Sequence, residues 1–263
     1  MRLLALLTDF GAIDPYVGIM KGVVQRACPG APMVDVTHGI SPQDVRQAAF
    51  VLASAVPYFP RDTIFLAVVD PGVGTRRRAV VVETEGPTFV APDNGILTWA
   101  LELAPPRAAW RFDRPQYFLD AVSQTFHGRD VFAPVCGHLL CGVAPSDMGT
   151  PVPLDSLARF ERYGARVEAD YAEARISYVD RFGNLVTNLH RRALGEVEVH
   201  CVRLGDVDAP FASSYRDVPD GEMLCIWGSF DRLEVARSMG NAASALGLGV
   251  GDYVHVLLAR STA

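Results

Sequence analysis

Lysine is almost absent from this 263-residue sequence: Lys21 is the only one among 24 basic residues. Acidic residues number 30, so the formal net charge is −6. Nucleic-acid-binding proteins usually carry a basic surplus, so we expect no nucleic-acid partner. We attribute the excess of arginine over lysine to genome composition rather than to function.

Cysteine is sparse and follows no metal-binding pattern. The five residues form an odd set without a CxxC motif: Cys28, Cys136, Cys141, Cys201 and Cys225. The Cys136/Cys141 pair has no second pair or histidine cluster at zinc spacing, so a structural zinc is not expected. Buried thiols in a reducing compartment are the simpler interpretation.

Long apolar runs are also missing, and none approaches the ~20 residues of a membrane-spanning helix. The N-terminal segment MRLLALLTDFG has a short apolar run, but an acidic residue follows at once and no cleavage motif is present. We interpret it as a first strand rather than a signal peptide. With 49% hydrophobic and 21% charged residues, the composition is globular and excludes disorder. We expect a cytoplasmic protein with no membrane partner.

The first part of the chain alternates apolar, strand-like runs with amphipathic stretches. We predict strands over 3–7, 33–36, 64–69, 79–83 and 88–91, and helices over 16–28, 44–57 and 132–140. Pro42 is expected in the first turn of the second helix. This rhythm predicts an α/β N-terminal domain with a mostly parallel sheet over residues 1–158.

The pattern changes after residue 158. The charged segment 159–174 is predicted to be a connector. Short alternating runs broken by turn residues follow, at 175–179, 184–189, 197–204, 223–227, 233–236 and 253–258. They predict a smaller all-β, barrel-like C-terminal domain over residues 175–263.

Polar residues follow the predicted strands at Asp9, His38 and Asp70. In open α/β sheets, ligands bind beyond the carboxyl ends of the strands. One such residue could be a helix cap, but several with Gly or Pro beside most of them favour a binding site.

No GxGxxG, phosphate-loop, GxSxG or HExxH motif is present to name the chemistry of this site. A hydrolytic metal centre is one interpretation, because carboxylates with imidazoles suit Mn, Fe or Zn. Its members would be Asp9, His38, Asp70, Asn94 and His127. Their spacing matches no established metal motif, so a metal-dependent phosphohydrolase stays an alternative.

Six short motifs occur in one order: TDFGAIDPYVGIMKG, VDVTHGISPQDV, VVDPGVGTRRR, APDNG, TFHGRD and YVDRFGNLVTN. Together they resemble the S-adenosyl-L-methionine hydrolase family, the SAM hydroxide adenosyltransferases, over about residues 2–258. This family is related to the fluorinases and chlorinases. The resemblance implies an α/β N-terminal domain and a barrel-like C-terminal domain. It also implies a homotrimer that binds substrate between the N-terminal domain of one chain and the C-terminal domain of its neighbour.

The resemblance assigns a water-activating set to Asp70 of VVDPGVG, Arg77 of TRRR and His127 of FHGRD. A carboxylate and an imidazole can accept a proton from water, and a guanidinium stabilises hydroxide character. Arg76 and Arg78 flank Arg77, so the sequence leaves open which arginine faces the nucleophile.

The substrate contacts are assigned in the same way. Asp9 matches the carboxylate that holds both ribose hydroxyls, and two acceptor oxygens suit a vicinal diol. The remaining candidates are Asp14 and Asp180 for the methionine ammonium, Ser229 for its carboxylate, Phe182 and Asn184 for adenine, and Tyr215, Arg237, Asn241 and Ala242 around the base. In the GSFDRLE segment, Gly228 and Asp231 replace an Asn and a Gly of the family pattern, which puts the local turn in question.

The resemblance favours hydrolysis over halogenation. The halogenases have a Tyr where Asp70 stands, the fluorinase has a Ser where Gly128 stands, and the fluorinase insertion is absent here. A carboxylate beside the nucleophile would repel halide. We therefore predict hydrolysis of S-adenosyl-L-methionine to adenosine and L-methionine, with no metal and no organic cofactor. A non-catalytic sensor of S-adenosylmethionine or adenosine is the second alternative, although a pure binding pocket has no need of a water-activating set.

Overall fold

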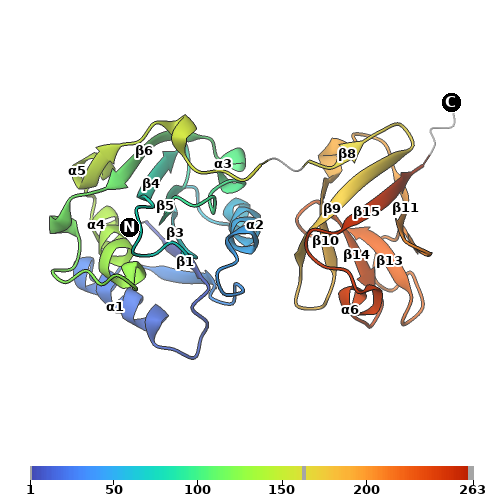
Figure 1. Ribbon diagram of the computed structural model, residues 1–263, viewed down its shortest axis with the longest axis horizontal. Helices are drawn as coiled ribbons and strands as arrows, with labels where there is room; N and C mark the ends of the chain where they lie inside the picture. Colours follow the sequence, from blue (N-terminus) through green and yellow to red (C-terminus); the bar gives the residue numbers. More distant parts are fainter. Residues whose placement is uncertain (1, 162–163, 260–263) are drawn as a thin grey trace. The chain divides into compact units, whose positions relative to one another are not determined.

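The computed structural model describes residues 2–161 and 164–259. The chain divides into two compact units, Met1–Phe160 and Glu161–Ala263, and each has its own sheet (Figure 1). We refer to them as the N-terminal and C-terminal units. Among the described residues, no helix combines the length and apolarity that crossing a bilayer requires.

The N-terminal unit is built on a seven-stranded sheet with the order β2-β1-β3-β5-β4-β6-β7. The strands are β1 (Leu4–Thr8), β2 (Met33–Thr37), β3 (Ile64–Val68), β4 (Ala79–Thr84), β5 (Thr88–Pro92), β6 (Pro106–Phe112) and β7 (Gly149–Pro151). Pairings among β2, β1, β3 and β5 are parallel, whereas β4, β6 and β7 pair antiparallel. The sheet is therefore mixed, not mostly parallel as predicted. The link from β4 to β5 is only residues 85–87, which is too short for the crossover that parallel strands require.

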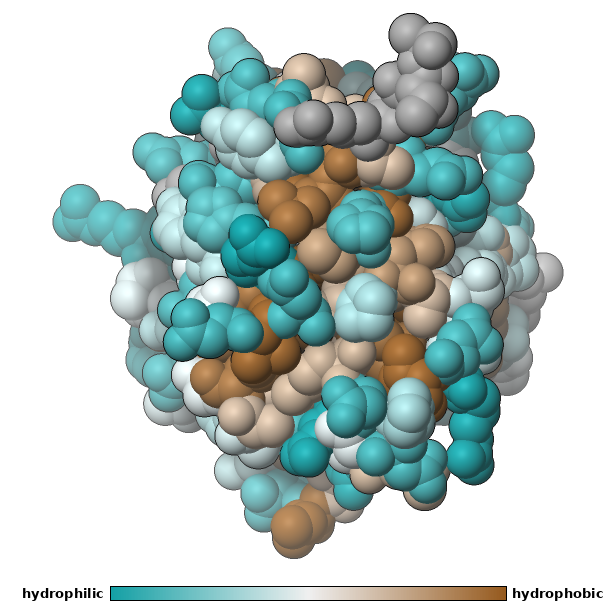
Figure 2. Space-filling model, turned by 90° about the vertical axis from the view of Figure 1, so that its right-hand side faces the viewer, coloured by the Kyte–Doolittle hydropathy of each residue, from teal (hydrophilic) through white to brown (hydrophobic). Residues whose placement is uncertain are grey.

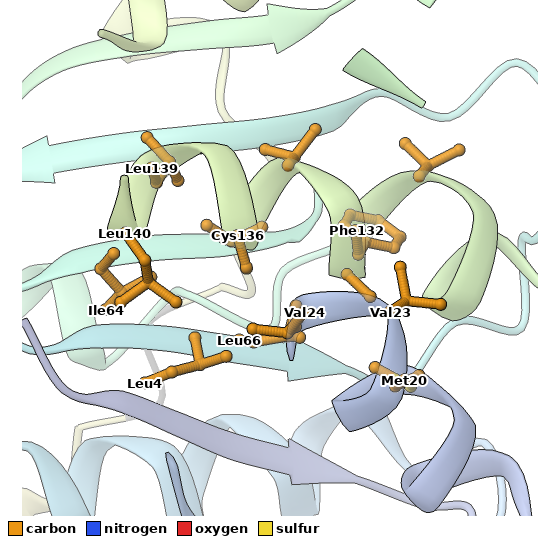
Figure 3. Packing of buried hydrophobic residues seen from close by; sticks show 14 of the residues in the cluster. Leu4, Met20, Val23, Val24, Ile64, Leu66, Phe132, Cys136, Leu139 and Leu140 are labelled. Atoms are coloured by element: carbon orange, nitrogen blue, oxygen red, sulfur yellow. The ribbon is translucent and has the colours of Figure 1, made fainter. Parts of the chain in front are cut away.

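Both faces of this sheet are covered, which explains the uninterrupted apolar strands. Leu4 and Leu6 of β1 pack into a cluster with helices α1 (Tyr16–Ala27) and α4 (Ala133–Leu140). Their neighbours Ala5 and Leu7 point the other way, into a cluster with α2 (Val45–Ala55) and α3 (Ala100–Leu103). Figure 1 shows these helix pairs on opposite sides of the sheet, and Figure 3 shows the α1/α4 side.

The second helix begins later than predicted. It starts at Val45, and Asp44 caps it by accepting a hydrogen bond from the backbone N–H of Gln47 at 2.8 Å. Gln43 has a φ of 68°, a left-handed conformation that cannot extend a helix. Pro42 therefore lies in the preceding turn and not in the first helical turn.

The C-terminal unit is an antiparallel sheet with the order β12-β11-β15-β9-β10-β14-β13, and β8 pairs with β9. A bridge from Phe211, just past β12, to Cys225 of β13 nearly closes it into a barrel. The elements are β8 (Arg166–Val167), β9 (Tyr171–Val179), β10 (Leu185–His190), β11 (Val199–Leu204), β12 (Val207–Pro210), β13 (Met223–Trp227), β14 (Arg232–Arg237), α6 (Ala242–Leu246) and β15 (Tyr253–Leu258).

Part of the segment expected as a connector, 159–174, is strand in the structure. It contains β8 and the first four residues of β9, while residues 162 and 163 lie outside the described residues. Ala172 and Ala174 alternate with polar residues and are buried in the barrel core. This two-residue period is typical of a half-buried strand, and the charged residues between the alanines conceal it.

Helices α1 and α4 approach most closely at Gly137. A Cβ atom on Gly137 would lie 2.4 Å from the Cβ of Ala27, so only glycine permits this packing distance. We expect Gly137→Ala to lower the free energy of unfolding by about 1–3 kcal/mol through overpacking. Gly22→Ala on α1, where a Cβ would meet no atom within 4 Å, should stabilise the helix by about 0.5–1 kcal/mol. Urea unfolding of both variants checks this, and equal effects would contradict the packing argument.

Candidate active site

Four residues predicted from the sequence lie at one edge of the N-terminal sheet. Asp9, His38, Asp70 and Asn94 each follow the end of β1, β2, β3 or β5, which run parallel. Because carboxyl ends of parallel strands share an edge, these residues are brought together there. Arg77 precedes β4, which runs in the opposite direction and so begins at the same edge.

Asp70, Arg77 and His127 form one connected group. Arg77 Nε donates to both carboxylate oxygens of Asp70, at 3.0 and 2.9 Å, and Arg77 Nη2 donates to Oδ2 at 2.5 Å. The same Nη2 lies 2.9 Å from His127 Nδ1. The Asp70 side chain is only 6% exposed. The guanidinium thus forms an ion pair with a nearly buried carboxylate and holds the imidazole beside it.

The protonation of His127 follows from this contact. A guanidinium can only donate hydrogen bonds, so His127 Nδ1 must accept. Burial lowers the pKa of His127, and the positive charge of Arg77 lowers it further. The neutral ring therefore carries its proton on Nε2, while a hydrogen bond to the backbone of Ser123 acts against the lowering of the pKa.

The three adjacent arginines have different surroundings. Arg78 is paired with Asp93, whose Oδ2 it contacts through Nε at 2.7 Å, and also with Ser156. Arg76 is exposed. The geometry therefore selects Arg77 as the arginine beside Asp70.

The loop that presents His127 is anchored by the buried Asp130. Asp130 Oδ2 accepts from the backbone N–H of Ser123 at 2.8 Å, and its Oδ1 pairs with Arg129 at 2.5 Å. Burial raises the pKa of Asp130, but these hydrogen bonds outweigh it and lower the pKa overall. His127 precedes a π-helical turn, Gly128–Phe132, that leads into α4. Such turns are frequent at functional sites.

The other polar residues at this edge of the sheet form hydrogen bonds within the N-terminal unit. Asp9 Oδ2 accepts from the backbone N–H of Gln43 at 2.8 Å, which leaves Oδ1 for a ligand. His38 Nδ1 lies 2.8 Å from Thr8 Oγ1, and Asn94 donates to the carbonyl of Val69 at 2.8 Å. Asp14 is exposed between β1 and α1.

A metal centre does not fit this arrangement. Asp70 accepts hydrogen bonds from Arg77. His38 contacts the hydroxyl of Thr8, and Asn94 donates to the backbone carbonyl of Val69. Within residues 2–161 and 164–259, no group of three His, Cys, Asp or Glu side chains is placed to hold a metal ion. The set proposed as a metal alternative from the sequence is therefore not a ligand set in the fold.

In the C-terminal unit, the turn 180–184 between β9 and β10 is organised by Asp180. Its Oδ1 accepts from the backbone N–H groups of Phe182 and Asn184, both at 2.8 Å, and its Oδ2 accepts from Asn184 Nδ2 at 2.9 Å. Asn184 is buried, whereas Phe182 is 76% exposed. Phe182 is thus not a core residue, and its ring is free to stack on a ligand.

The start of α6 packs onto this turn. A Cβ on Gly183, whose φ is 85°, would lie 2.1 Å from Asn241 Cγ. Asn241 caps α6 by accepting from the N–H of Ser244 at 2.7 Å, and Ala242 is fully buried. Arg237 donates to the carbonyl of Gly221 at 2.7 Å. The structure therefore brings the 180–184 and 237–242 candidates together.

The turn 228–231 forms although Asp231 stands where the family pattern has a glycine. Asp231 has a φ of 55°, the left-handed region for which glycine is preferred. Its N–H donates to the carbonyl of Gly228 at 3.0 Å. Asp tolerates this conformation better than most residues, so the turn is kept and Ser229 is exposed at its tip.

No motif in the sequence marks Glu234 on β14. This carboxyl is buried and hydrogen-bonded to Tyr215, and its Oε1 would lie 1.8 Å from a Cβ on Gly228. Gly228, which replaces the family's Asn, thus leaves the space that Glu234 fills. Burial raises the pKa of Glu234 to about 7, and the charge of Asp180 adds to the rise. The only sequence feature that could have pointed to a buried carboxyl is the position of Glu234 between the apolar residues Leu233 and Val235.

Two domain families match the chain. Residues 4–149 match the family described as SAM hydroxide adenosyltransferase N-terminal domain, and residues 174–255 match its C-terminal domain. A protein of Thermus thermophilus named (R)-S-adenosyl-L-methionine hydrolase is 42% identical over 98% of this chain and 100% of its own. One of the same name from Salinispora tropica is 39% identical over 96% and 97%. A fluorinase of Nocardia brasiliensis is 26% identical over 97% and 96%.

Solved structures share the fold. The crystal structure of an uncharacterized conserved protein from Thermotoga maritima matches with a TM-score of 0.89 at 36% identity, covering 97% of this chain and 99% of that one. A conserved hypothetical protein from Thermus thermophilus matches with a TM-score of 0.83 at 42% identity, covering 98% and 100%.

We expect Glu234 to make the C-terminal unit less stable as the pH rises. An unfolded Glu titrates near 4.3, whereas the folded group titrates near 7. The folded state therefore binds the proton more tightly, and the stabilisation present below about pH 4 is lost as the pH rises through 7. The loss should be about 2–3 kcal/mol between pH 5 and pH 8.

Urea unfolding of the wild type and Glu234→Gln at pH 5 and pH 8 measures this difference. Trp99 and Trp110 are replaced by Phe in both proteins so that Trp227 reports on the C-terminal unit alone. The wild type should lose stability relative to Glu234→Gln at pH 8. Parallel pH dependences would contradict the assignment.

Proposed function

This chain belongs to the SAM hydroxide adenosyltransferase family, and we propose from that premise that it hydrolyses S-adenosyl-L-methionine to adenosine and L-methionine. The observation that carries the proposal is the partly buried, connected group Asp70–Arg77–His127 at the carboxyl edge of the sheet. The relatives' names specify the (R) sulfonium, and we extend that configuration to this chain's substrate.

The substrate's chemistry sets what the protein must supply. The sulfonium departs as a neutral thioether, so the leaving group needs no proton. The site must hold a water oxygen in line with C5′ and the sulfur and must accept one proton from it. Positioning supplies a large part of such a rate, and a general base adds about 10²–10⁴.

We assign these roles to the connected group. Asp70 accepts the proton of the attacking water, because its carboxylate retains lone pairs beyond those bonded to Arg77. His127 donates from Nε2 to the water oxygen and orients it, since its Nδ1 faces Arg77. Arg77 stabilises the developing hydroxide. The bond from C5′ to sulfur breaks as the bond from oxygen to C5′ forms.

Substrate binding is assigned to both units. Asp9 holds the ribose hydroxyls, and Asp14 and Asp180 hold the methionine ammonium, with Ser229 at the carboxylate end. The exposed ring of Phe182 stacks on adenine, and Asn184 reads its edge. Tyr215, Arg237, Asn241 and Ala242 complete the base pocket.

Hydroxide rather than halide is the nucleophile in this proposal. The negative charge of Asp70 disfavours a halide beside it. A side chain at Gly128 would lie 3.2 Å from Met20 Sδ and from Phe126 Cε2, and 3.3 Å from Phe10 Cε2. A serine there, as in the fluorinase, would require these side chains to move.

We also propose that the enzyme is a homotrimer whose site combines the N-terminal unit of one chain with the C-terminal unit of its neighbour. Hydrophobic surface supports an association of this kind. Figure 2 shows such surface gathered on one face that belongs to the C-terminal unit. In the N-terminal unit, Ile13 is 99% exposed beside Asp14, and Tyr16 and Ile19 are also exposed.

The first test is product analysis. Purified protein with S-adenosyl-L-methionine should yield adenosine and methionine equally with chelator and with chloride. A 5′-chloro nucleoside would indicate halogenation, loss of turnover in chelator would indicate a metal enzyme, and binding without product would indicate a sensor. Asp70→Ala and His127→Ala should reduce kcat by at least about 10² with binding largely kept.

The two neighbouring Arg–Asp pairs supply a matched control. Arg77→Gln should reduce kcat by about 10²–10³. Arg78→Gln removes an ion pair whose carboxylate is equally buried, at 6% exposure, and should lower stability without changing kcat more than about twofold. Equal losses of kcat would show that either pair acts only through the fold.

Co-expressed hybrids test the shared site. We combine Asp70→Ala with Phe182→Glu, which places a charge on the exposed ring position without disturbing the turn. Each site of a mixed trimer has about a one-in-four chance of receiving both intact units, so about a quarter of wild-type activity should return. Combining Asp70→Ala with Arg77→Gln, both in the N-terminal unit, should restore none. Equal activity in the two mixtures would refute a site shared between chains.

A further inference from the structure

Helices α1 and α4 run side by side and end at the same place. Near its start α1 approaches the π-helical turn that leads into α4, since a Cβ on Gly128 would lie 3.2 Å from Met20 Sδ. Their last turns meet where Gly137 packs on Ala27. Figure 3 shows the two helices, with Val24 labelled on α1 and Cys136 and Leu139 labelled on α4, and all three belong to one buried cluster. The pair is parallel, so the residues that follow each helix are also neighbours.

Those two residues are cysteines. Cys28 follows Ala27 and closes α1, and Cys141 lies one turn after Gly137 and closes α4. Cys141 Sγ lies 3.6 Å from the carbonyl oxygen of Ala27, and the two thiols are hydrogen-bonded to each other. Cys28 is buried and Cys141 is exposed. Their separation of 113 positions hides this pairing in the sequence.

We propose that Cys28 and Cys141 form a thiol–disulfide site, in which a small disulfide such as oxidised glutathione converts the two thiols into a bond that locks α1 to α4. The proposal is independent of the proposed function. Cys136, Cys201 and Cys225 are buried without a comparable exposed partner among the described residues, so they are not part of the site.

The exposed thiol reacts first. The Cys141 thiolate attacks the small disulfide RS–SR, which breaks the S–S bond, forms Cys141–S–S–R and releases RS⁻. The Cys28 thiolate then attacks the Cys141 sulfur and releases the second RS⁻. The two protein thiols lose two electrons and two protons, and RS–SR becomes two RSH. The hydrogen bond to Cys141, together with burial, raises the pKa of the Cys28 thiol to about 11, so Cys28 is the less reactive thiol and the first attack is left to Cys141.

The bond should change stability and leave the active site unchanged. It closes a ring of about 110 residues, and long rings restrict the unfolded chain most. His127 and Tyr16 lie at the opposite ends of the helix pair, roughly 20 Å away at 1.5 Å per residue. We therefore expect a rise in Tm of about 5–10 °C with kcat altered less than twofold.

The test uses the full chain, reduced and then incubated with oxidised glutathione. Blocking free thiols under denaturing conditions should leave three reactive cysteines of the five, and mass spectrometry should find the peptides of Cys28 and Cys141 joined. Dithiothreitol should reverse both the bond and the Tm rise. Five free thiols, or only a glutathione adduct on Cys141, would overturn the proposal.

Single variants separate this site from general oxidation. Cys141→Ser, at an exposed position, should form no intramolecular bond and show no rise in Tm after oxidation. Cys136→Ala, five positions earlier on α4, should still form the bond. An intramolecular disulfide in Cys141→Ser would refute the assignment of the bond to Cys28 and Cys141. A disulfide in the wild type without a change in Tm would refute the proposal that it locks α1 to α4.

Discussion

The contact of Arg77 with Asp70 is the interaction on which the N-terminal site depends. A carboxylate that is 6% exposed would be strongly disfavoured in its charged form without a partner. By donating to both Asp70 and His127, the guanidinium binds the carboxylate and adds to the effect of burial in lowering the pKa of His127. One side chain therefore sets the tautomer of His127 and joins the three residues into one connected group.

The surrounding fold holds that guanidinium in place through close backbone packing. Gly74 has a φ of 75°, and a Cβ there would lie 2.4 Å from the carbonyl oxygen of Gln124. The loop after β3 therefore packs directly against the loop that presents His127. The aromatic ring of Phe132, with its centroid 5.4 Å from Arg77 Cζ, closes the other side. Asp130 holds the second loop through a hydrogen bond from the backbone N–H of Ser123, so packing and hydrogen bonds both position the two loops.

In the C-terminal unit, carboxylates order the polar turns: one accepts several hydrogen bonds within its turn, and another is buried beside a turn. Asp180 organises the turn that exposes Phe182, and Glu234 occupies the space above Gly228 while bonding to Tyr215. The proximity of Asp180 makes Glu234 harder to ionise. A cationic ligand near Asp180 would offset that effect, which links the charge of the proposed substrate to the stability of this unit.

The sequence by itself determined the βα rhythm, the β-rich second half and the family, because apolar periodicity and ordered motifs are local properties. It placed Asp9, Asp70 and His127 at the ends of elements for the same reason. The short link 85–87 already implies that β4 and β5 pair antiparallel, but the sequence did not reveal β6, whose apolar residues follow no uniform period. Only the tertiary structure decided that Arg77 rather than Arg76 or Arg78 meets Asp70, that Glu234 is buried beside Tyr215, and that Cys28 lies against Cys141. Those pairings join residues on different elements, and their distances depend on how helices and strands pack.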